Sequence, residues 1–286
     1  MRLALAVEEL GRNAIVINAD SAQVYADLAI LSARPTAEEM RGVEHVLFGA
    51  WDGAEACSAA DWAAAATREI DAAHDAGKLP ILVGGTGLYL RTLLDGIAPI
   101  PEIDSAVRAN VRTMDTAAAY AALQSEDPER ATKLAPTDSQ RIARALEVVR
   151  STGRTLTQWQ EQREGGIGQR IALAPLVLLP ERDWLYERCD RRFVQMLDCG
   201  AVEEVEALLA RDLSPELPVM RAIGVPEIAA MLRGEMSRKE ALNGGQQATR
   251  NYAKRQFTWL RHQPPQDWPR VSPEYVDFET HFEILF

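Results

Sequence analysis

Asp20 is the side chain whose position most clearly suggests chemistry. It directly follows residues 14–19, a short β-branched run that is typical of a buried parallel strand. Open α/β sheets bind ligands at the carboxyl ends of such strands, where a carboxylate can act as a general base. A helix cap or a turn is the alternative role. Ser21, Ala22 and Gln23 come next, and this segment could contact a base edge or form the first turn of a helix.

A glycine-rich turn, Gly-Gly-Thr-Gly at residues 84–87, is the second candidate. It follows the apolar run 79–83 and precedes a helical pattern. A strand, such a turn and a helix start together allow backbone N–H groups to approach a phosphate, and the hydroxyl of Thr86 adds a donor. Because glycine signals of this kind are weak by themselves, a tight turn without a ligand is the alternative.

Arginines in two other segments could serve an anionic substrate. Arg221 follows a proline-bearing loop and could stabilise a pyrophosphate leaving group, or it could be a solvated surface arginine. Arg141 and Arg144 lie three residues apart in a capped helix start at 138–147. They share one helix face, which could contact RNA or could form surface ion pairs.

The overall charge argues against a generic nucleic-acid binder. The chain has 31 Lys and Arg against 42 Asp and Glu, a formal net charge of −11, whereas such binders are normally basic. Any contact with a polynucleotide must therefore use local patches. Residues 246–263 offer one, or else a solvated helix face, because they hold four cations and no acid: Arg250, Lys254, Arg255 and Arg261.

Composition limits the class of protein further. The 286 residues are 47% hydrophobic, enough for a full core, and no apolar run approaches the length of a membrane span. Three cysteines without a CxxC pair indicate a reducing compartment, and the four histidines show no zinc spacing. We expect a cytoplasmic protein without a membrane span or a protein-bound metal, and a monomer is the default.

The order of the patterns predicts an α/β protein with a helical insertion. Strand-like and helical patterns alternate over residues 1–101, which favours a parallel sheet flanked by helices. Residues 102–168 show helical patterns alone, and a strand-like run returns at 171–179. We therefore expect a discontinuous core of residues 1–101 and 169–263, the insertion 102–168, and a loosely ordered tail at 264–286.

Six segments, taken in order, resemble the tRNA dimethylallyltransferase (tRNA isopentenyltransferase) family. The resemblance implies a P-loop-NTPase-like parallel sheet with an inserted helical domain that grips the tRNA anticodon stem-loop. It implies transfer of a dimethylallyl group from dimethylallyl diphosphate to N6 of the adenine 3′-adjacent to the anticodon, in tRNAs that read codons beginning with U. Mg²⁺ would be bound through the diphosphate, and nothing requires ATP. The matching segments are residues 17–25, 32–35, 83–89, 138–147, 217–224 and 249–261.

The resemblance also implies roles for single residues. Asp20 matches the family's general base, Thr86 a residue near the reacting adenine, and Arg221 the arginine at the pyrophosphate, which Arg34 could assist. The family's tRNA contacts carry over to a longer set: Asp20, Ser21, Ala22, Gln23, Arg108, Gln140, Arg141, Ile142, Ala143, Arg144, Arg250, Lys254 and Arg255.

Two segments depart from the family pattern. Residues 31–35 read Leu-Ser-Ala-Arg-Pro where the family is closer to Gly-Thr-Ala-Lys-Pro. The family's G-x-x-x-x-G-K-[ST] loop and the strand before it are absent. Loss of an interior strand would leave unpaired backbone and an apolar gap, so we expect that the true start lies upstream. A chain that begins at Met1 is expected to have weak or no activity.

Three other functions compete with this one. Prenyl transfer to a free adenine nucleotide would need neither the helical insertion nor the basic stretch. A nucleotide kinase-like enzyme would need a replacement for the lost loop. A tRNA-binding homologue without catalysis fits that loss, but it would have no need to retain Asp20, Thr86 and Arg221 together.

Overall fold

The apolar segment Ala14–Asn18 forms β1, the central strand of the main sheet in this computed structural model. β2 (Glu44–Val46) and β3 (Leu79–Val83) pair with it on either side, both parallel to it. All five residues of β1 are buried, as expected for a strand covered on both faces. The structure describes residues 1–282, apart from the side chains of 278 and 279.

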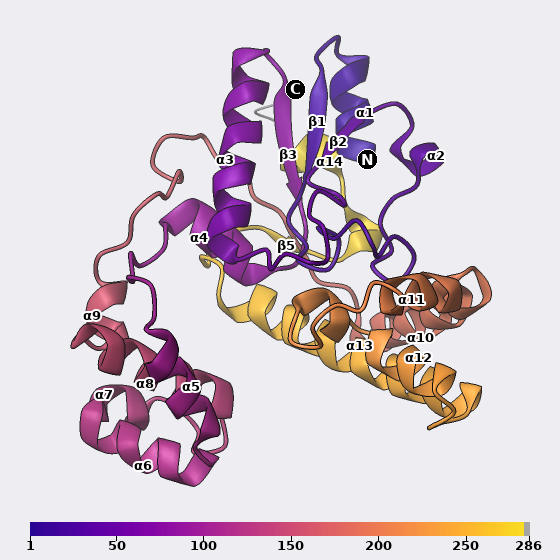
Figure 1. The fold of residues 1–286 in the computed structure, drawn as a ribbon. Coiled ribbons are helices and arrows are strands. Elements are labelled where there is room, and N and C mark those ends of the chain that lie inside the picture. The colour runs from indigo at the N-terminus through magenta and orange to yellow at the C-terminus, as the bar shows by residue number, and fades with distance from the viewer. Residues whose placement is uncertain (283–286) are drawn as a thin grey trace. The chain divides into compact units, whose positions relative to one another are not determined.

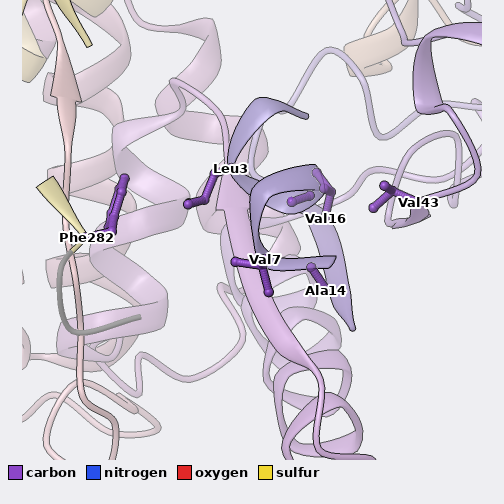
Figure 2. Close-up of a cluster of buried hydrophobic side chains, with 7 residues drawn as sticks. Leu3, Val7, Ala14, Val16, Val43 and Phe282 are labelled. Atoms are coloured by element: carbon purple, nitrogen blue, oxygen red, sulfur yellow. The ribbon is translucent and has the colours of Figure 1, made fainter. Parts of the chain in front are cut away.

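Helices cover this sheet and confirm the α/β class (Figure 1). α1 (Arg2–Glu9) packs on the face of β1 that carries Ala14 and Val16, and the buried cluster there is drawn in Figure 2. α3 (Ala59–Asp75) packs against β1 and β3 and begins at a capping box on Ser58. Short α2 (Ala37–Met40) precedes β2, and α4 (Gly87–Asp95) follows β3.

The chain divides into two compact units. The first combines Met1–Leu93 with Ile171–Phe286, and the second is Leu94–Arg170. The second unit is longer than the expected insertion 102–168. An antiparallel bridge between Ile97 and Glu164 joins the segments before and after its helices. The backbone N–H groups of Ile97 and Glu164 donate to each other's carbonyl oxygens, at 2.9 and 3.0 Å. These two hydrogen bonds make the flanking residues part of the second unit.

The second unit is built from helices around its own core. Its elements are α5 (Ser105–Thr113), α6 (Thr116–Glu126), α7 (Pro128–Thr132), α8 (Ser139–Thr152) and α9 (Leu156–Gln160). Val111, Leu123, Ile142 and Leu146 are among its buried core residues. Aspartates cap four of the five helices, since a side-chain oxygen of Asp104, Asp115, Asp127 or Asp138 accepts from a first-turn N–H.

A helical layer completes the first unit (Figure 1). It consists of α10 (Arg182–Asp198), α11 (Ala201–Leu209), the short helix η1 (Pro218–Arg221), α12 (Val225–Leu232) and α13 (Arg238–His262). Gly200, at a φ of 106°, separates α10 from α11. α10 and α13 pack closely because Gly245 admits the Phe193 ring: a Cβ at Gly245 would lie 2.0 Å from that ring.

The C-terminal segment, for which the sequence predicts a loosely ordered tail, contains short regular elements between residues 264 and 282. β5 (Arg270–Val271) pairs in parallel with β4 (Val177–Leu178), and η2 (Pro273–Tyr275) and α14 (Phe278–His281) follow. Arg270 organises the proline-rich turn, because its guanidinium donates to four backbone carbonyls, and Phe282 is buried against α1 (Figure 2). Residues 283–286 lie outside the described part.

Replacement of Gly245 tests the packing of α10 on α13. Gly245→Ala places a methyl group inside the Phe193 ring, so we expect a loss of about 1–3 kcal/mol in the free energy of unfolding, measured in urea. Gly244→Ala is the matched control, because a Cβ there meets only the flexible side chain of Glu227, at 3.2 Å. It should be neutral or slightly stabilising. Equal losses for both variants would contradict this account of the packing.

Candidate active site

Asn18 turns the chain out of β1 and thereby places Asp20. The buried Asn18 Nδ2 donates to the carbonyl oxygens of Asp20 and Leu47, each at 3.0 Å, and its Oδ1 accepts from the Asp20 N–H at 2.9 Å. Asp20 Oδ1 accepts from the Ala22 N–H at 2.9 Å, which forms a turn. Among the described residues, Asp20 Oδ2 has no hydrogen-bond partner, so one carboxylate oxygen is available for chemistry.

The glycine-rich turn after β3 is joined to the segment that carries Asp20. The Ser21 N–H donates to Thr86 Oγ1 at 2.9 Å, and that hydroxyl in turn lies 3.2 Å from Ser21 Oγ. The Thr86 N–H donates to the Ala19 carbonyl at 3.2 Å. Thr86 therefore fixes the backbone on both sides of Asp20.

The glycines of this turn serve close packing. A Cβ at Gly84 would lie 2.2 Å from the backbone of Ala19, while Cβ atoms at Gly85 and Gly87 would overlap side chains of α13. Protein atoms already occupy the space beside these three glycines, which favours the tight-turn alternative over a phosphate cradle.

Asp20 faces a cavity of about 540 Å³ within the first unit. Its lining is largely apolar, with residues such as Leu28, Phe193 and Met196. One carboxylate, Asp20, and three arginines line it: Arg192, Arg221 and Arg255. The cavity is therefore a positively charged, mostly apolar space inside an acidic chain.

Burial changes the acid–base properties of this cavity. It raises the pKa of Asp20, while the hydrogen bond from the Ala22 N–H and the charge of Arg192 act in the opposite direction. Burial likewise raises the pKa of Tyr89, whose ring stacks on Trp62 with centroids 4.5 Å apart. The pKa of Tyr252 rises for the same reason, and its hydroxyl lies within reach of Thr86 and Ser21.

The loop that forms another wall is held by one carboxylate. Glu204, on α11, accepts from three consecutive backbone N–H groups, those of Ala29, Ile30 and Leu31, at 2.6, 2.8 and 2.9 Å. Leu31 and Ser32 line the cavity. Glu204 thus links the helical layer to the wall of the site.

Several residues predicted from the sequence come together here. Asp20, Ser21 and Ala22 line the cavity with Arg221 and Arg255, and Thr86 is bonded to Ser21. Arg221 reaches the cavity while its guanidinium is paired with Glu216 and donates to the Pro215 carbonyl at 3.2 Å.

Other predicted residues point elsewhere. Gln23 donates to the carbonyls of Ser32 and Ala33, at 3.0 Å each, so its amide supports a loop and does not line the cavity. Arg34 packs against Gly49 and Tyr25, and it is likewise outside the cavity lining. The side chains of Gln23 and Arg34 thus lie outside the cavity lining, and their contacts with tRNA and with the diphosphate stay predictions.

Two of the basic residues expected on α13 differ in their surroundings. Arg250 is paired with Asp190 at 2.5 Å and bonded to Gln247, so its charge is largely compensated. Lys254 is exposed.

The helical unit carries the remaining predicted tRNA contacts. Gln140, Arg141 and Arg144 lie exposed on α8, Ala143 is half-buried, and Arg108 is exposed on α5, with its charge near Arg144. Ile142 is an exception, since its side chain is fully buried in the unit's core and cannot reach a ligand. Its apolar type and spacing fit the core face of α8, which is the signal that would have excluded it.

Glu147 organises this basic surface. It is buried, and its carboxylate lies 3.1 Å from Arg112 Nε and 3.8 Å from Arg144 Nη1. Arg112 was not among the predicted contacts, although Arg108 and Arg112 are four residues apart on α5 and share a face.

The protein's own donors do not form a magnesium site in this cavity. Mg²⁺ prefers several oxygen ligands, whereas the lining offers one carboxylate beside three arginines. No group of three or more His, Cys, Asp or Glu suited to a metal ion occurs within the described residues. Among the helices of the described residues, none is long and apolar enough to cross a membrane.

The sequence and the fold both match those of a known family. The IPP transferase family pattern matches residues 23–263, and the chain belongs to this family. The tRNA dimethylallyltransferase of Novosphingobium aromaticivorans is 74% identical over 92% of this chain and 93% of its own length. That of Erythrobacter litoralis is 65% identical over 100% and 90%.

Solved structures agree. The tRNA isopentenylpyrophosphate transferase of Bacillus halodurans has a TM-score of 0.65 at 32% identity, covering 99% of this chain and 90% of that one. A eukaryotic dimethylallyltransferase acting on tRNA has a TM-score of 0.77 at 25% identity, covering 99% and 73%.

Removal of the Glu204 carboxylate tests the anchor of the cavity wall. Glu204→Ala leaves three N–H groups without their acceptor, and we expect the free energy of unfolding to fall by about 1.5–3 kcal/mol. Glu203→Ala, at the exposed neighbouring position, controls for loss of charge and should change it by less than about 0.5 kcal/mol. Urea unfolding of both variants makes the comparison, and equal losses would show that Glu204 is no anchor.

Proposed function

We propose that this protein transfers a dimethylallyl group from dimethylallyl diphosphate to the N6 amine of the adenine 3′-adjacent to the anticodon, in tRNAs that read codons beginning with U. The observation that carries the proposal is Asp20, whose carboxylate has one unpartnered oxygen in an apolar cavity lined by arginines. The names of the related proteins support tRNA as the acceptor.

Asp20 is the proposed general base. An exocyclic adenine amine is a poor nucleophile, and loss of its proton to a carboxylate assists its attack. The new bond joins N6 to the C1 carbon of the dimethylallyl group, while the bond from C1 to the diphosphate oxygen breaks. The N6 proton passes to Asp20 Oδ2, and pyrophosphate leaves with the bonding electron pair. Thr86 holds the segment that carries Asp20 close to the reacting base.

Arg221 is the proposed cation at the leaving group, since it lines the same cavity as Asp20. Its pairing with Glu216 would have to be exchanged for the diphosphate, a partner with more negative charge. Mg²⁺ would arrive on the diphosphate, because the cavity lining offers it one carboxylate beside three arginines. The apolar lining suits the dimethylallyl group and keeps water from the reacting carbon.

The RNA acceptor explains the surfaces outside the cavity. Arg108, Arg141 and Arg144 on the helical unit are the proposed contacts to the anticodon stem-loop, with Lys254 and Arg255 on α13. Extrusion of the target base costs a few kcal/mol and is easiest from a loop. We propose a cytoplasmic monomer, in keeping with a soluble tRNA substrate.

The proposal is tested with the purified chain, a tRNA transcript and dimethylallyl diphosphate. With the protein in excess over the RNA and a long incubation, so that weak activity is also detected, mass spectrometry of the digested RNA should find one dimethylallyl group on the N6 of the adenine next to the anticodon. Adenosine monophosphate in place of tRNA should give no product. Modification of the nucleotide alone would instead support a free-nucleotide prenyltransferase, and binding of the stem-loop without product would support a non-catalytic tRNA binder.

Asp20→Asn removes the base while keeping the turn, because an amide oxygen can still accept from the Ala22 N–H. The rate of transfer should fall by roughly 10²–10⁴-fold, with binding of the stem-loop retained. Asp267→Asn, at an exposed position in the C-terminal segment, is the matched control and should leave the rate unchanged. A full rate for Asp20→Asn would exclude Asp20 as the base.

The pH dependence of transfer should report the burial of Asp20. The base acts as the carboxylate, so the rate rises with pH and falls as Asp20 is protonated. Burial raises the pKa of this carboxyl, which places the acid limb above the usual aspartate range. Single-turnover rates between pH 4 and 9 measure it; an acid limb that persists unchanged in Asp20→Asn would assign the titration to another group.

A further inference from the structure

The three arginines that line the cavity differ in how their charges are compensated. Arg221 is paired with Glu216 and bonded to a backbone carbonyl. The guanidinium of Arg255 lies 5.6 Å from the centre of the Tyr252 ring, a cation–π arrangement. Arg192 has neither an ion pair nor a hydrogen bond within residues 1–282.

The other arginines of α10 are engaged elsewhere or lie outside the cavity. Arg182 and Arg188 lie over the rings of Phe257 and Trp184, at 5.9 and 5.4 Å. Arg191 and Arg192 are both exposed, and of the two only Arg192 lines the cavity. Arg192 is therefore the residue through which α10 brings a guanidinium without an ion pair or a hydrogen bond among the described residues to the cavity that contains Asp20.

We propose that Arg192 is a diphosphate-binding residue of this cavity, an assignment that rests on the proposed function for its substrate. A guanidinium presents several N–H donors in one plane and binds two oxygens of a phosphate group at once. Arg192 is positioned to do so without first giving up a carboxylate partner, unlike Arg221. Asp20 and Arg192 also share the cavity, so one side chain serves the acceptor amine and the other the leaving group.

Arg192 would supply positive charge that the pyrophosphate leaving group needs in addition to Arg221. Pyrophosphate carries more negative charge than one half-engaged arginine can neutralise. Arg192, Arg221 and Arg255 line the cavity with Asp20 as its one carboxylate. Because Glu216 already compensates Arg221, Arg192 supplies positive charge that Arg221 does not. Arg192, Arg221 and Arg255 are themselves exposed, so water screens part of this charge and their guanidinium groups are accessible to an incoming diphosphate.

Binding of inorganic pyrophosphate, measured by calorimetry with and without Mg²⁺, tests the assignment without any transfer reaction. Arg192→Gln should weaken binding by about 10–100-fold, the loss expected for charge-assisted hydrogen bonds. Arg192→Lys should have an intermediate effect, because it keeps the charge and loses the planar pair of donors. Arg191→Gln is the matched control, one residue away on the same helix, and should bind like the unaltered protein.

Steady-state transfer to tRNA provides the second readout. Arg192→Gln should raise the KM for dimethylallyl diphosphate while the KM for tRNA stays unchanged. Equal pyrophosphate affinity in Arg192→Gln and Arg191→Gln, or no binding by the unaltered protein, would overturn the assignment. If pyrophosphate binding depends on Arg192 but no dimethylallyl group is transferred, the proposed function fails and the anion site stands.

Discussion

The contact between the glycine-rich turn after β3 and the end of β1 is the constraint on which the site depends. A Cβ atom at Gly84 would lie only 2.2 Å from the backbone of Ala19. Glycine is therefore required for the turn to approach the end of β1 this closely. That approach brings the Thr86 hydroxyl to the Ser21 N–H and so fixes the direction in which Asp20 leaves the sheet. The same turn receives α13, through Trp259 packed at Gly87, so the helical layer and the sheet meet at the residues that carry the proposed chemistry.

The arginines of this acidic molecule have different surroundings in the cavity and elsewhere. Most arginines of the chain for which an ion pair is seen serve the structure: Arg211 holds Asp27 and Asp52 together, and Arg250 is paired with Asp190. The cavity is different, because its lining places cations opposite a single carboxylate. The diphosphate that we propose as substrate would therefore meet local positive charge in a chain whose net charge is −11. In the helical unit, by contrast, the arginines lie at the surface beside a buried carboxylate, that of Glu147, which contacts Arg112 and Arg144.

The sequence predicted the parts of this structure that depend on local pattern. The buried strand 14–18 and the placement of Asp20 at a strand end follow from apolar runs and the general geometry of parallel sheets. It did not predict contacts that form only in the folded chain. Gln23 and Arg34 donate to carbonyls of neighbouring loops, and Arg270 donates to four carbonyls in the segment that the sequence predicts to be loosely ordered. Arg192 gave no signal, because α10 mixes four arginines with several acids and only packing against α13 shows which of them faces the cavity.

The central claim is that Asp20 meets the reacting amine, and a crystal structure of the protein with an anticodon stem-loop tests it most directly. The measured quantity is the distance from Asp20 Oδ2 to N6 of the adenine next to the anticodon. We predict an extruded adenine in the cavity with its N6 about 2.6–3.2 Å from that oxygen. An adenine that remains stacked in the loop, or one bound with its N6 directed away from Asp20, would contradict the account.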